Sequence, residues 1–156
     1  MFGHFARRWY VYLPLVIGYG WALEHIRINW TPSLPYYVVY VQPNVPLQRG
    51  DLVVFRFEGA EIAHHFRGQS FFKRIAGMPG DEISVQDRNV FIEGVSVGFA
   101  RSRTLDGHAL HPIEPGIIPE GRFYVQGTHP MSFDSRYRVN GLIAAEQVLG
   151  RAKVIF

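Results

Sequence analysis

Lys73 is the residue of this chain whose surroundings most favour chemistry. It lies in an apolar run over residues 71–76 that stops at a turn over residues 78–81, and this pattern predicts a β-strand. Because side chains alternate along a strand, Lys73 should share a face with Phe71 and Ile75. An ammonium between two apolar side chains is poorly hydrated, so its pKa should fall from about 10.4 towards neutrality. The free amine could then act as general base for a serine hydroxyl; the alternative is a lysine that reaches water from an edge strand.

Short runs of β-branched and aromatic residues must position this lysine. The chain has 156 residues, 47% of them hydrophobic and 19% charged, which indicates a folded core. Turns rich in Gly, Pro, Asn and Asp separate the apolar runs and favour a mostly β fold. Strands are predicted over residues 36–41, 51–57, 71–76, 81–85, 90–92, 95–99, 121–127 and 150–156. Residues 101–115 are polar and irregular, and residues 139–147 can hold a single helical turn.

The charge and the cysteine content exclude several classes of partner and site. The net charge is +3, but the basic residues are scattered and no basic stripe with interleaved aromatics occurs, so no nucleic-acid partner is expected. The chain has no cysteine, which excludes disulfides and cysteine-ligated zinc. The absence of cysteine is compatible with an extracytoplasmic domain.

The N-terminal segment carries no charge from Trp9 to Leu23. Arg7 and Arg8 precede it, and a full membrane span usually needs about 20 residues. Three interpretations compete: a retained membrane anchor, a cleaved signal peptide, and a buried helix that Pro14 would interrupt. A retained transmembrane helix is favoured, and the arginine pair then places the N-terminus in the cytoplasm.

Four segments of the chain stand in an order and spacing that resemble a known family. They are Thr31 to Pro35, Arg49 to Phe55, Lys73 to Asp81, and Pro119 to Gly127 followed by Ser132 to Tyr137. Together they resemble the type I signal peptidases, which are serine–lysine proteases. The resemblance runs from about Ile28 to the C-terminus. It implies a periplasmic, signal-peptidase-like β domain over residues 28–156, with a small β excursion, behind a membrane anchor within residues 1–27.

The resemblance implies that this chain is a serine endopeptidase. Ser33 corresponds to the nucleophile, and Lys73 corresponds to the general base that deprotonates it. Thr31 and the backbone N–H of Ser33 correspond to the oxyanion hole.

Three further positions correspond to supporting groups of the family. Ser132 matches the hydroxyl that orients the lysine amine. Asp134 and Arg136 match a charged pair that braces the site without reacting. The implied mechanism uses no cofactor and no metal ion.

The implied substrate is the extended stretch before the cleavage site of an exported precursor. It is expected to add as a strand beside residues that flank the dyad, namely Ile28, Asn29, Trp30, Gln69, Ser70, Phe71 and Phe72. The Asn-x-Thr-x-Ser-x-Pro pattern over residues 29–35 is similar to the conjugative-transfer branch of the family, which matures pilin precursors. The resemblance therefore implies a precursor protein, such as a pilin, and the bacterial inner membrane as partners.

Other chemistries and functions stay open on the residues alone. Ser33 could form a Ser-His-Asp triad with His64 or His65, and His108 with His111 could bind a metal ion, although exposed loop histidines are favoured. One alternative function is a soluble serine–lysine autoprotease of the repressor-cleavage type. Another is a non-catalytic anchored β module of a secretion or pilus assembly.

Overall fold

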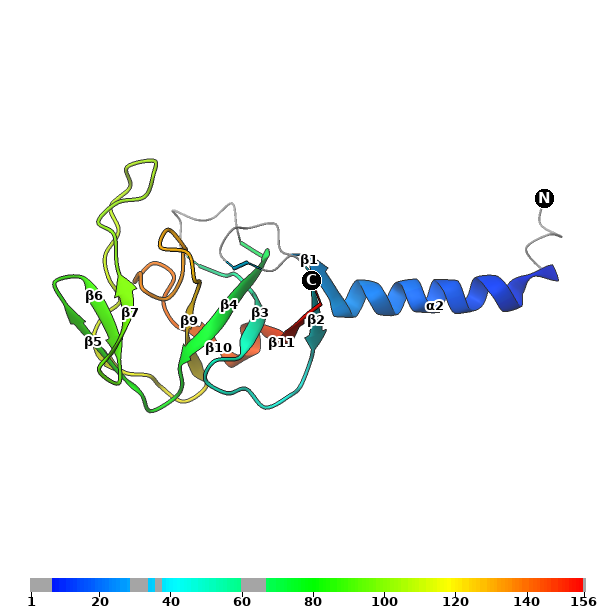
Figure 1. The fold of residues 1–156 in the computed structure, drawn as a ribbon, viewed down its shortest axis with the longest axis horizontal. Helices are drawn as coiled ribbons and strands as arrows, with labels where there is room; N and C mark the ends of the chain where they lie inside the picture. Colours follow the sequence, from blue (N-terminus) through cyan, green and yellow to red (C-terminus); the bar gives the residue numbers. More distant parts are fainter. Residues whose placement is uncertain (1–6, 29–33, 36–37, 60–66, 156) are drawn as a thin grey trace.

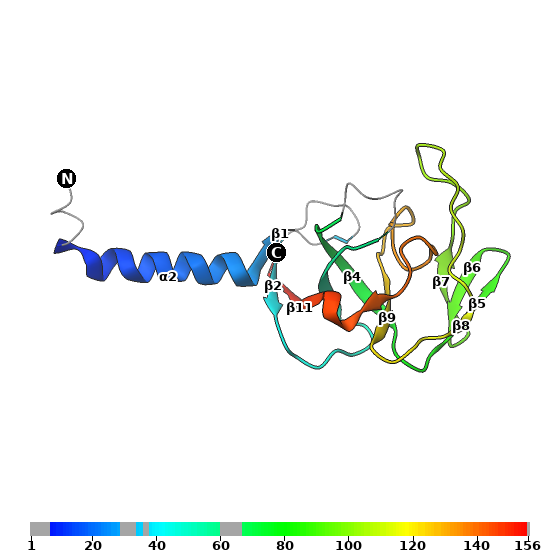
Figure 2. The same cartoon turned by 180° about the vertical axis from the view of Figure 1, so that it is seen from behind.

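The chain forms one long helix followed by a β domain, as the computed structural model shows (Figures 1 and 2). The structure describes residues 7–28, 34–35, 38–59 and 67–155. Helix α2, Trp9–His25, projects away from the domain and leads directly into strand β1, Ile26–Ile28. The mostly β fold predicted from the sequence is confirmed.

A seven-stranded antiparallel sheet forms the larger part of the domain. Its order is β1-β2-β11-β3-β4-β9-β10, so the C-terminal strand lies between two strands from the first half of the chain. The bounds are β2 Val38–Gln42, β11 Val148–Val154, β3 Leu52–Arg56, β4 Ser70–Gly77, β9 Arg122–Gln126 and β10 Ile143–Ala144. A 3-10 turn, η2 Ala145–Gln147, joins β10 to β11.

A four-stranded antiparallel sheet forms the smaller part of the domain. Its order is β7-β6-β5-β8, with bounds β5 Glu82–Gln86, β6 Asn89–Ile92, β7 Val95–Phe99 and β8 Gly116–Ile117. A two-residue turn at Asp87 and Arg88 joins β5 to β6, and both residues have positive φ, as a type I′ hairpin turn requires. Residues 101–115, where the sequence predicted an excursion, connect β7 to β8 and contain only isolated bridges.

Both faces of the central strands are buried, which explains their continuous apolar runs. On one face, Val53 and Phe55 of β3 pack with Ile75 and Val125. On the other face, Leu52 and Val54 of β3 pack in a second cluster with Phe72, Leu34, Val39, Val41 and Ala152. A third cluster, which includes Ile83, Val90, Ile92 and Tyr124, fills the space between the two sheets.

The sequence predicted the long strands and missed the short ones. Strands β2 to β7, β9 and β11 lie where alternation and turns placed them, although residues 36–37 and 156 lie outside the described residues. Strands β1, β8 and β10 were missed because each has only two or three residues, too few to display a period of two. The expected helical turn within residues 139–147 is the 3-10 turn η2.

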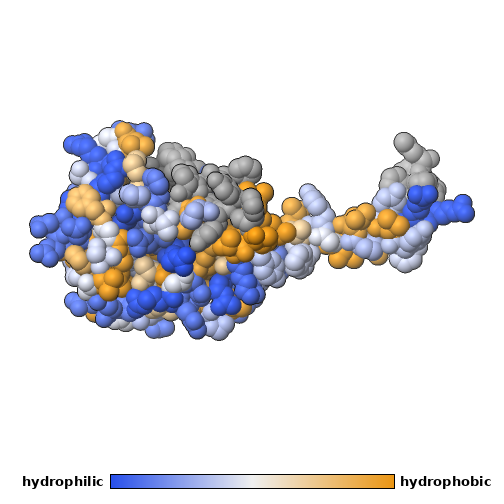
Figure 3. All heavy atoms as spheres, in the orientation of Figure 1, coloured by the Kyte–Doolittle hydropathy of each residue, from blue (hydrophilic) through white to orange (hydrophobic). Residues whose placement is uncertain are grey.

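Helix α2 exposes apolar side chains along its length and buries none (Figure 3). Pro14 lies inside the helix without ending it. Trp21 and His25 stack on each other and on Tyr40 of β2, with ring centroids 4.9–5.8 Å apart, and these contacts join the helix to the domain. Within the described part of the chain, no helix is both long and apolar enough to cross a membrane, so the predicted transmembrane helix is not confirmed.

Candidate active site

Lys73 lies at the centre of β4 with its side chain in the interior. It pairs with Val53 of β3, and residues that pair across antiparallel strands point to the same face. The sequence prediction is therefore right: Lys73 lies on the face of Phe71 and Ile75, and only 2% of its surface is exposed. Its Nζ atom lies 5.6 Å from the centre of the Phe71 ring.

Burial lowers the pKa of Lys73 from 10.5 to about 8. The negative charge of Asp134 raises this pKa and the positive charge of Arg136 lowers it, but each effect is smaller than that of burial. Because the two charges belong to one ion pair, their opposite influences on Lys73 partly cancel. At pH 7, roughly one Lys73 amine in ten is therefore uncharged and able to accept a proton.

Asp134 and Arg136 form a buried, two-point ion pair beside the lysine. Arg136 Nε donates to Oδ1 of Asp134 at 2.8 Å, and its Nη2 donates to Oδ2 at 2.9 Å. The backbone N–H of Gly127 also donates to Oδ2, at 3.0 Å. Burial alone would lower the pKa of Arg136, but the hydrogen bonds and the charge of Asp134 raise it above its usual value. The carboxylate is thus fully hydrogen-bonded, which suits a bracing role.

Ser132 lies in the same turn and is held through its backbone. Its N–H donates to the carbonyl of His129 at 2.9 Å, and its carbonyl accepts a bond from Arg136 Nη2 at 3.1 Å. The residue is buried, and within the described residues its hydroxyl has no hydrogen-bond partner. A buried hydroxyl without a partner costs about 1–3 kcal/mol, so a polar group that reached it would be stabilised. The role of Ser132 in orienting Lys73 stays a prediction.

The predicted nucleophile and its neighbours lie outside the described residues. These are Asn29, Trp30, Thr31 and Ser33. The described residues on either side are Ile28, which is exposed at the end of β1, and Leu34, which is buried against Val39 and Phe72. The roles of Ser33 and Thr31 therefore remain predictions.

The residues predicted to bind substrate on β4 lie at the start of that strand. Residues 70–73 pair with β3, but β9 pairs with β4 only from Arg74 onwards. Gln69 and Ser70 are exposed and Phe71 faces the lysine side, whereas Phe72 packs into the core cluster of the opposite face.

Two buried hydroxyls near the site were not predicted from the sequence. The Ser135 hydroxyl accepts a hydrogen bond from the backbone N–H of Val125 at 3.0 Å and ties the turn to β9. Tyr124 is fully buried, and burial raises the pKa of its hydroxyl far above the usual value. Both residues lay in segments that the sequence had singled out, but only the tertiary contacts show that their side chains point inwards.

The alternative histidine sites gain no support from the structure. His64 and His65 lie outside the described residues, and His108 and His111 are exposed. No group of three or more His, Cys, Asp or Glu side chains that could hold a metal ion occurs among the residues the structure describes.

Comparisons with known proteins agree with the resemblance seen in the sequence. The family model described as signal peptidase, peptidase S26, matches residues 15–156. A conjugal transfer protein TraF from Agrobacterium fabrum is 30% identical over 83% of this chain and 81% of its own length. A probable signal peptidase I-2 from Synechocystis is 34% identical over 70% of this chain, and the match spans 48% of that protein.

One further curated relative and one solved structure are also similar to this chain. Signal peptidase I T from Bacillus subtilis is 28% identical over 70% of this chain and 57% of its own length. A crystal structure of a signal peptidase I from Enterococcus faecalis V583 aligns over 70% of this chain and 98% of its own, with a TM-score of 0.43 and 24% identity. The chain thus spans about half the length of several curated relatives.

Proposed function

Because the chain belongs to the signal peptidase family, peptidase S26, we propose that it is a serine endopeptidase that cleaves leader peptides from exported precursors. Signal peptidase I homologues in this family are serine endopeptidases, as the sequence resemblance implied. The observation that carries the proposal is the burial of Lys73, which brings its pKa to about 8 and provides a free amine near neutral pH.

The proposed reaction uses Ser33 as nucleophile and Lys73 as base. The neutral amine of Lys73 takes the proton of the Ser33 hydroxyl while the oxygen attacks the scissile carbonyl. The ammonium so formed gives this proton to the leaving amine, and the departure of that amine leaves an acyl-enzyme. The neutral amine then takes a proton from a water molecule, which attacks the ester carbonyl. The ester bond breaks, the Lys73 ammonium returns the proton to the Ser33 oxygen, and the second product leaves.

Polar groups around the dyad complete the proposed machinery. Thr31 and the backbone N–H of Ser33 stabilise the oxyanion, and the loss of one such donor typically costs about 10²–10³ in rate. Ser132 holds the amine of Lys73, since its buried hydroxyl is unpartnered within the described residues. Asp134 and Arg136 support the site by fixing the turn that carries Ser132.

The proposed substrate is an extended peptide that adds as a strand beside residues 28–31 and residues 69–72, which flank the dyad. The exposure of Ser70 at the start of β4, three residues before the buried Lys73, supports this mode of binding. We further propose that the precursor belongs to a conjugative transfer system, such as a pilin precursor. The similarity to a conjugal transfer protein over most of both chains supports this choice.

The N-terminal region is proposed to anchor the enzyme in the bacterial inner membrane. The apolar side chains that α2 exposes, with Arg7 and Arg8 before them, support an anchor within residues 1–27 and a cytoplasmic N-terminus. Residues 28–156 would then form a periplasmic catalytic domain.

A precursor-processing assay with two variants tests the function. Ser33→Ala and Lys73→Met should each lower the rate of cleavage by at least about 10³-fold, because each removes one half of the dyad. Matched controls are Ser96→Ala and Lys153→Met, which change an exposed serine and the other lysine of the chain. Unchanged processing by both dyad variants would end the protease proposal.

A further inference from the structure

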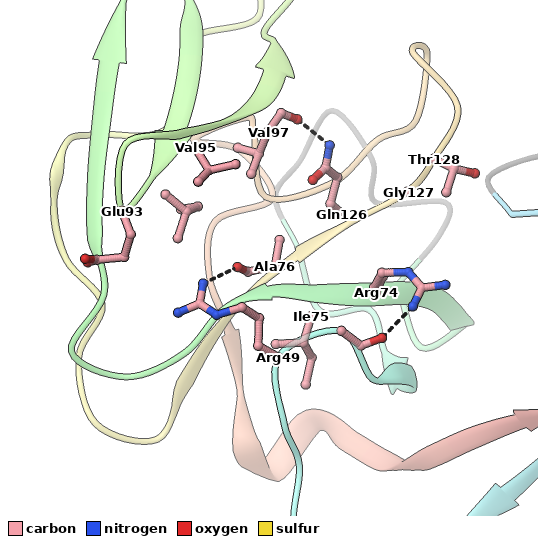
Figure 4. Close-up of a pocket in the computed structure, with 12 residues that line it drawn as sticks. Arg49, Arg74, Ile75, Ala76, Glu93, Val95, Val97, Gln126, Gly127 and Thr128 are labelled. Carbon is pink, nitrogen blue, oxygen red and sulfur yellow. Dashed lines mark hydrogen bonds between the residues drawn. The ribbon is translucent and has the colours of Figure 1, made fainter.

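A groove of about 570 Å³ lies between β4 and β7, on the side of β4 to which Arg74 points (Figure 4). This volume lies within the range of about 300–1,000 Å³ that is typical of ligand sites. Arg74 follows Lys73 directly in β4, so the two side chains point to opposite faces of the sheet. The groove therefore lies on the opposite face of β4 from the side chain of Lys73.

The groove has an apolar wall that is open to solvent. Val95 and Val97 of β7 face Ala76 of β4 across it, and Val95 is 67% exposed. β7 is the terminal strand of the four-stranded sheet. Edge strands with neighbouring apolar pockets are a common docking place for extended peptides.

The charges around the groove favour an acidic ligand. Arg49 is neutralised, because its Nη2 bonds Asp81 at 2.6 Å and its Nη1 bonds the carbonyl of Ala76. The carboxylate of Glu93 accepts a bond from the backbone of Glu82, and it points away from the other lining side chains in Figure 4. Arg74 has a bond to the carbonyl of Gly50 at 2.6 Å, and no carboxylate contacts it within the described residues. Arg74 and Glu93 lie at opposite ends of the lining in Figure 4, so the end of the groove at Arg74 carries a positive charge.

One end of the groove is continuous with the turn of the candidate active site. Gly127 and Thr128 line that end. The N–H of Gly127 also donates to Asp134, whose charge acts on Lys73. A polypeptide held in the groove would thus lie next to the segment that carries Ser132.

We propose that this groove binds an extended segment of the precursor in which apolar and acidic residues alternate, outside the stretch that is cut. This inference rests on the proposed function, because it takes the substrate of the same active site as the occupant. The apolar side chains contact Val95 and Val97, and a carboxylate binds the guanidinium of Arg74. The groove then acts as a second recognition site that raises the affinity for suitable precursors.

A peptide-binding measurement tests the site without any cleavage. The probe is a short fluorescent peptide in which Val and Glu alternate, titrated with the full chain and followed by anisotropy. Arg74→Gln should weaken its binding about threefold to tenfold, and Val95→Asp should weaken it at least as much. The matched control is Arg56→Gln, an exposed arginine on the adjacent strand β3, and it should bind as the unmodified chain does.

A second peptide without carboxylates measures how much the charge of the probe contributes to binding. When Gln replaces Glu in the probe, the affinity for the unmodified chain should fall to that of the Arg74→Gln variant for the acidic probe. Equal affinities of the unmodified chain for the two peptides would overturn the assignment of an acidic ligand. Circular dichroism verifies that each variant is folded, which is expected because Arg74 and Val95 are both exposed.

A processing experiment identifies the precursor as the occupant. Two preproteins that differ only in an alternating Val–Glu or Val–Gln segment after the cleavage site are compared. The acidic preprotein should have the lower KM, and Arg74→Gln should abolish that difference. If the acidic peptide binds through Arg74 but the two KM values are equal, the precursor is not the occupant and the proposal fails. Failure of the protease function itself shows separately, as unchanged processing by Ser33→Ala and Lys73→Met.

Discussion

The two faces of β4 place neighbouring cations in opposite environments. Lys73 is 2% exposed among apolar side chains, and its pKa is lowered to about 8. Arg74, the next residue, is exposed and donates to a backbone carbonyl. A basic side chain on this strand therefore becomes a candidate base only when burial lowers its pKa, as it does for Lys73.

The two faces also differ in what surrounds each cation. The inner face holds the ion pair of Asp134 and Arg136, whose hydrogen bonds are made in the interior. The outer face opens into the groove beside β7. A change on the inner face should therefore alter stability and catalysis, whereas a change on the outer face should alter only ligand binding.

The largest expected effect is the loss of unfolding free energy when the buried ion pair of Asp134 and Arg136 is broken. Arg136→Met leaves the carboxylate of Asp134 buried without its partner, which costs about 3–5 kcal/mol. Arg74→Met, on the outer face, should change the free energy of unfolding by no more than about 0.5 kcal/mol. Urea unfolding of both variants measures the difference. Equal losses of stability would show that the two faces do not differ as described.

The buried lysine should make stability depend on pH. The pKa of Lys73 is about 8 in the folded state and near 10.5 in the unfolded chain, so the unfolded chain binds more protons between these values. The contribution of Lys73 to the free energy of unfolding therefore rises by about 3 kcal/mol from pH 8 to pH 10.5. This gain is lost again as the pH falls back through 8.

The Lys73→Met substitution should remove this dependence of stability on pH, whereas substitution of an exposed lysine should not. Urea unfolding across this pH range should give a smaller rise in stability for Lys73→Met than for the unmodified chain. Lys153→Met is the matched control, because Lys153 is exposed on β11, and it should keep the full rise. Parallel curves for the unmodified chain and Lys73→Met would contradict a desolvated lysine.

The smallest effect is the pH dependence of the proposed reaction. Only the uncharged amine of Lys73 accepts a proton, so kcat/KM should rise about tenfold per pH unit below pH 8 and level off above it. Initial rates of precursor cleavage from pH 6 to pH 10 measure this profile. A rate that still climbs as the pH approaches about 10.4 would indicate a solvated lysine.

Local patterns in the sequence predicted the strand that carries Lys73 and the face on which it lies. Alternation needs only the neighbours Phe71 and Ile75, and the turn at residues 78–81 ends the run. The segments around Lys73 and Asp134 also pointed to the family, which the comparisons confirm. Strands β8 and β10 escaped prediction because a two-residue strand has no pattern of its own.

Properties that depend on distant segments came only from the tertiary structure. These include the insertion of β11 between β2 and β3 and the pairing of β9 with β4 from Arg74 to Gly77. The depth at which Lys73 is buried depends in the same way on β3, packed beside it from elsewhere in the chain. The sequence by itself determined which side chains alternate and which motifs occur. Contacts between residues far apart in the chain decided which strands pair and which side chains are shielded from water. The pKa of Lys73 and the groove on the other face of β4 follow from those contacts.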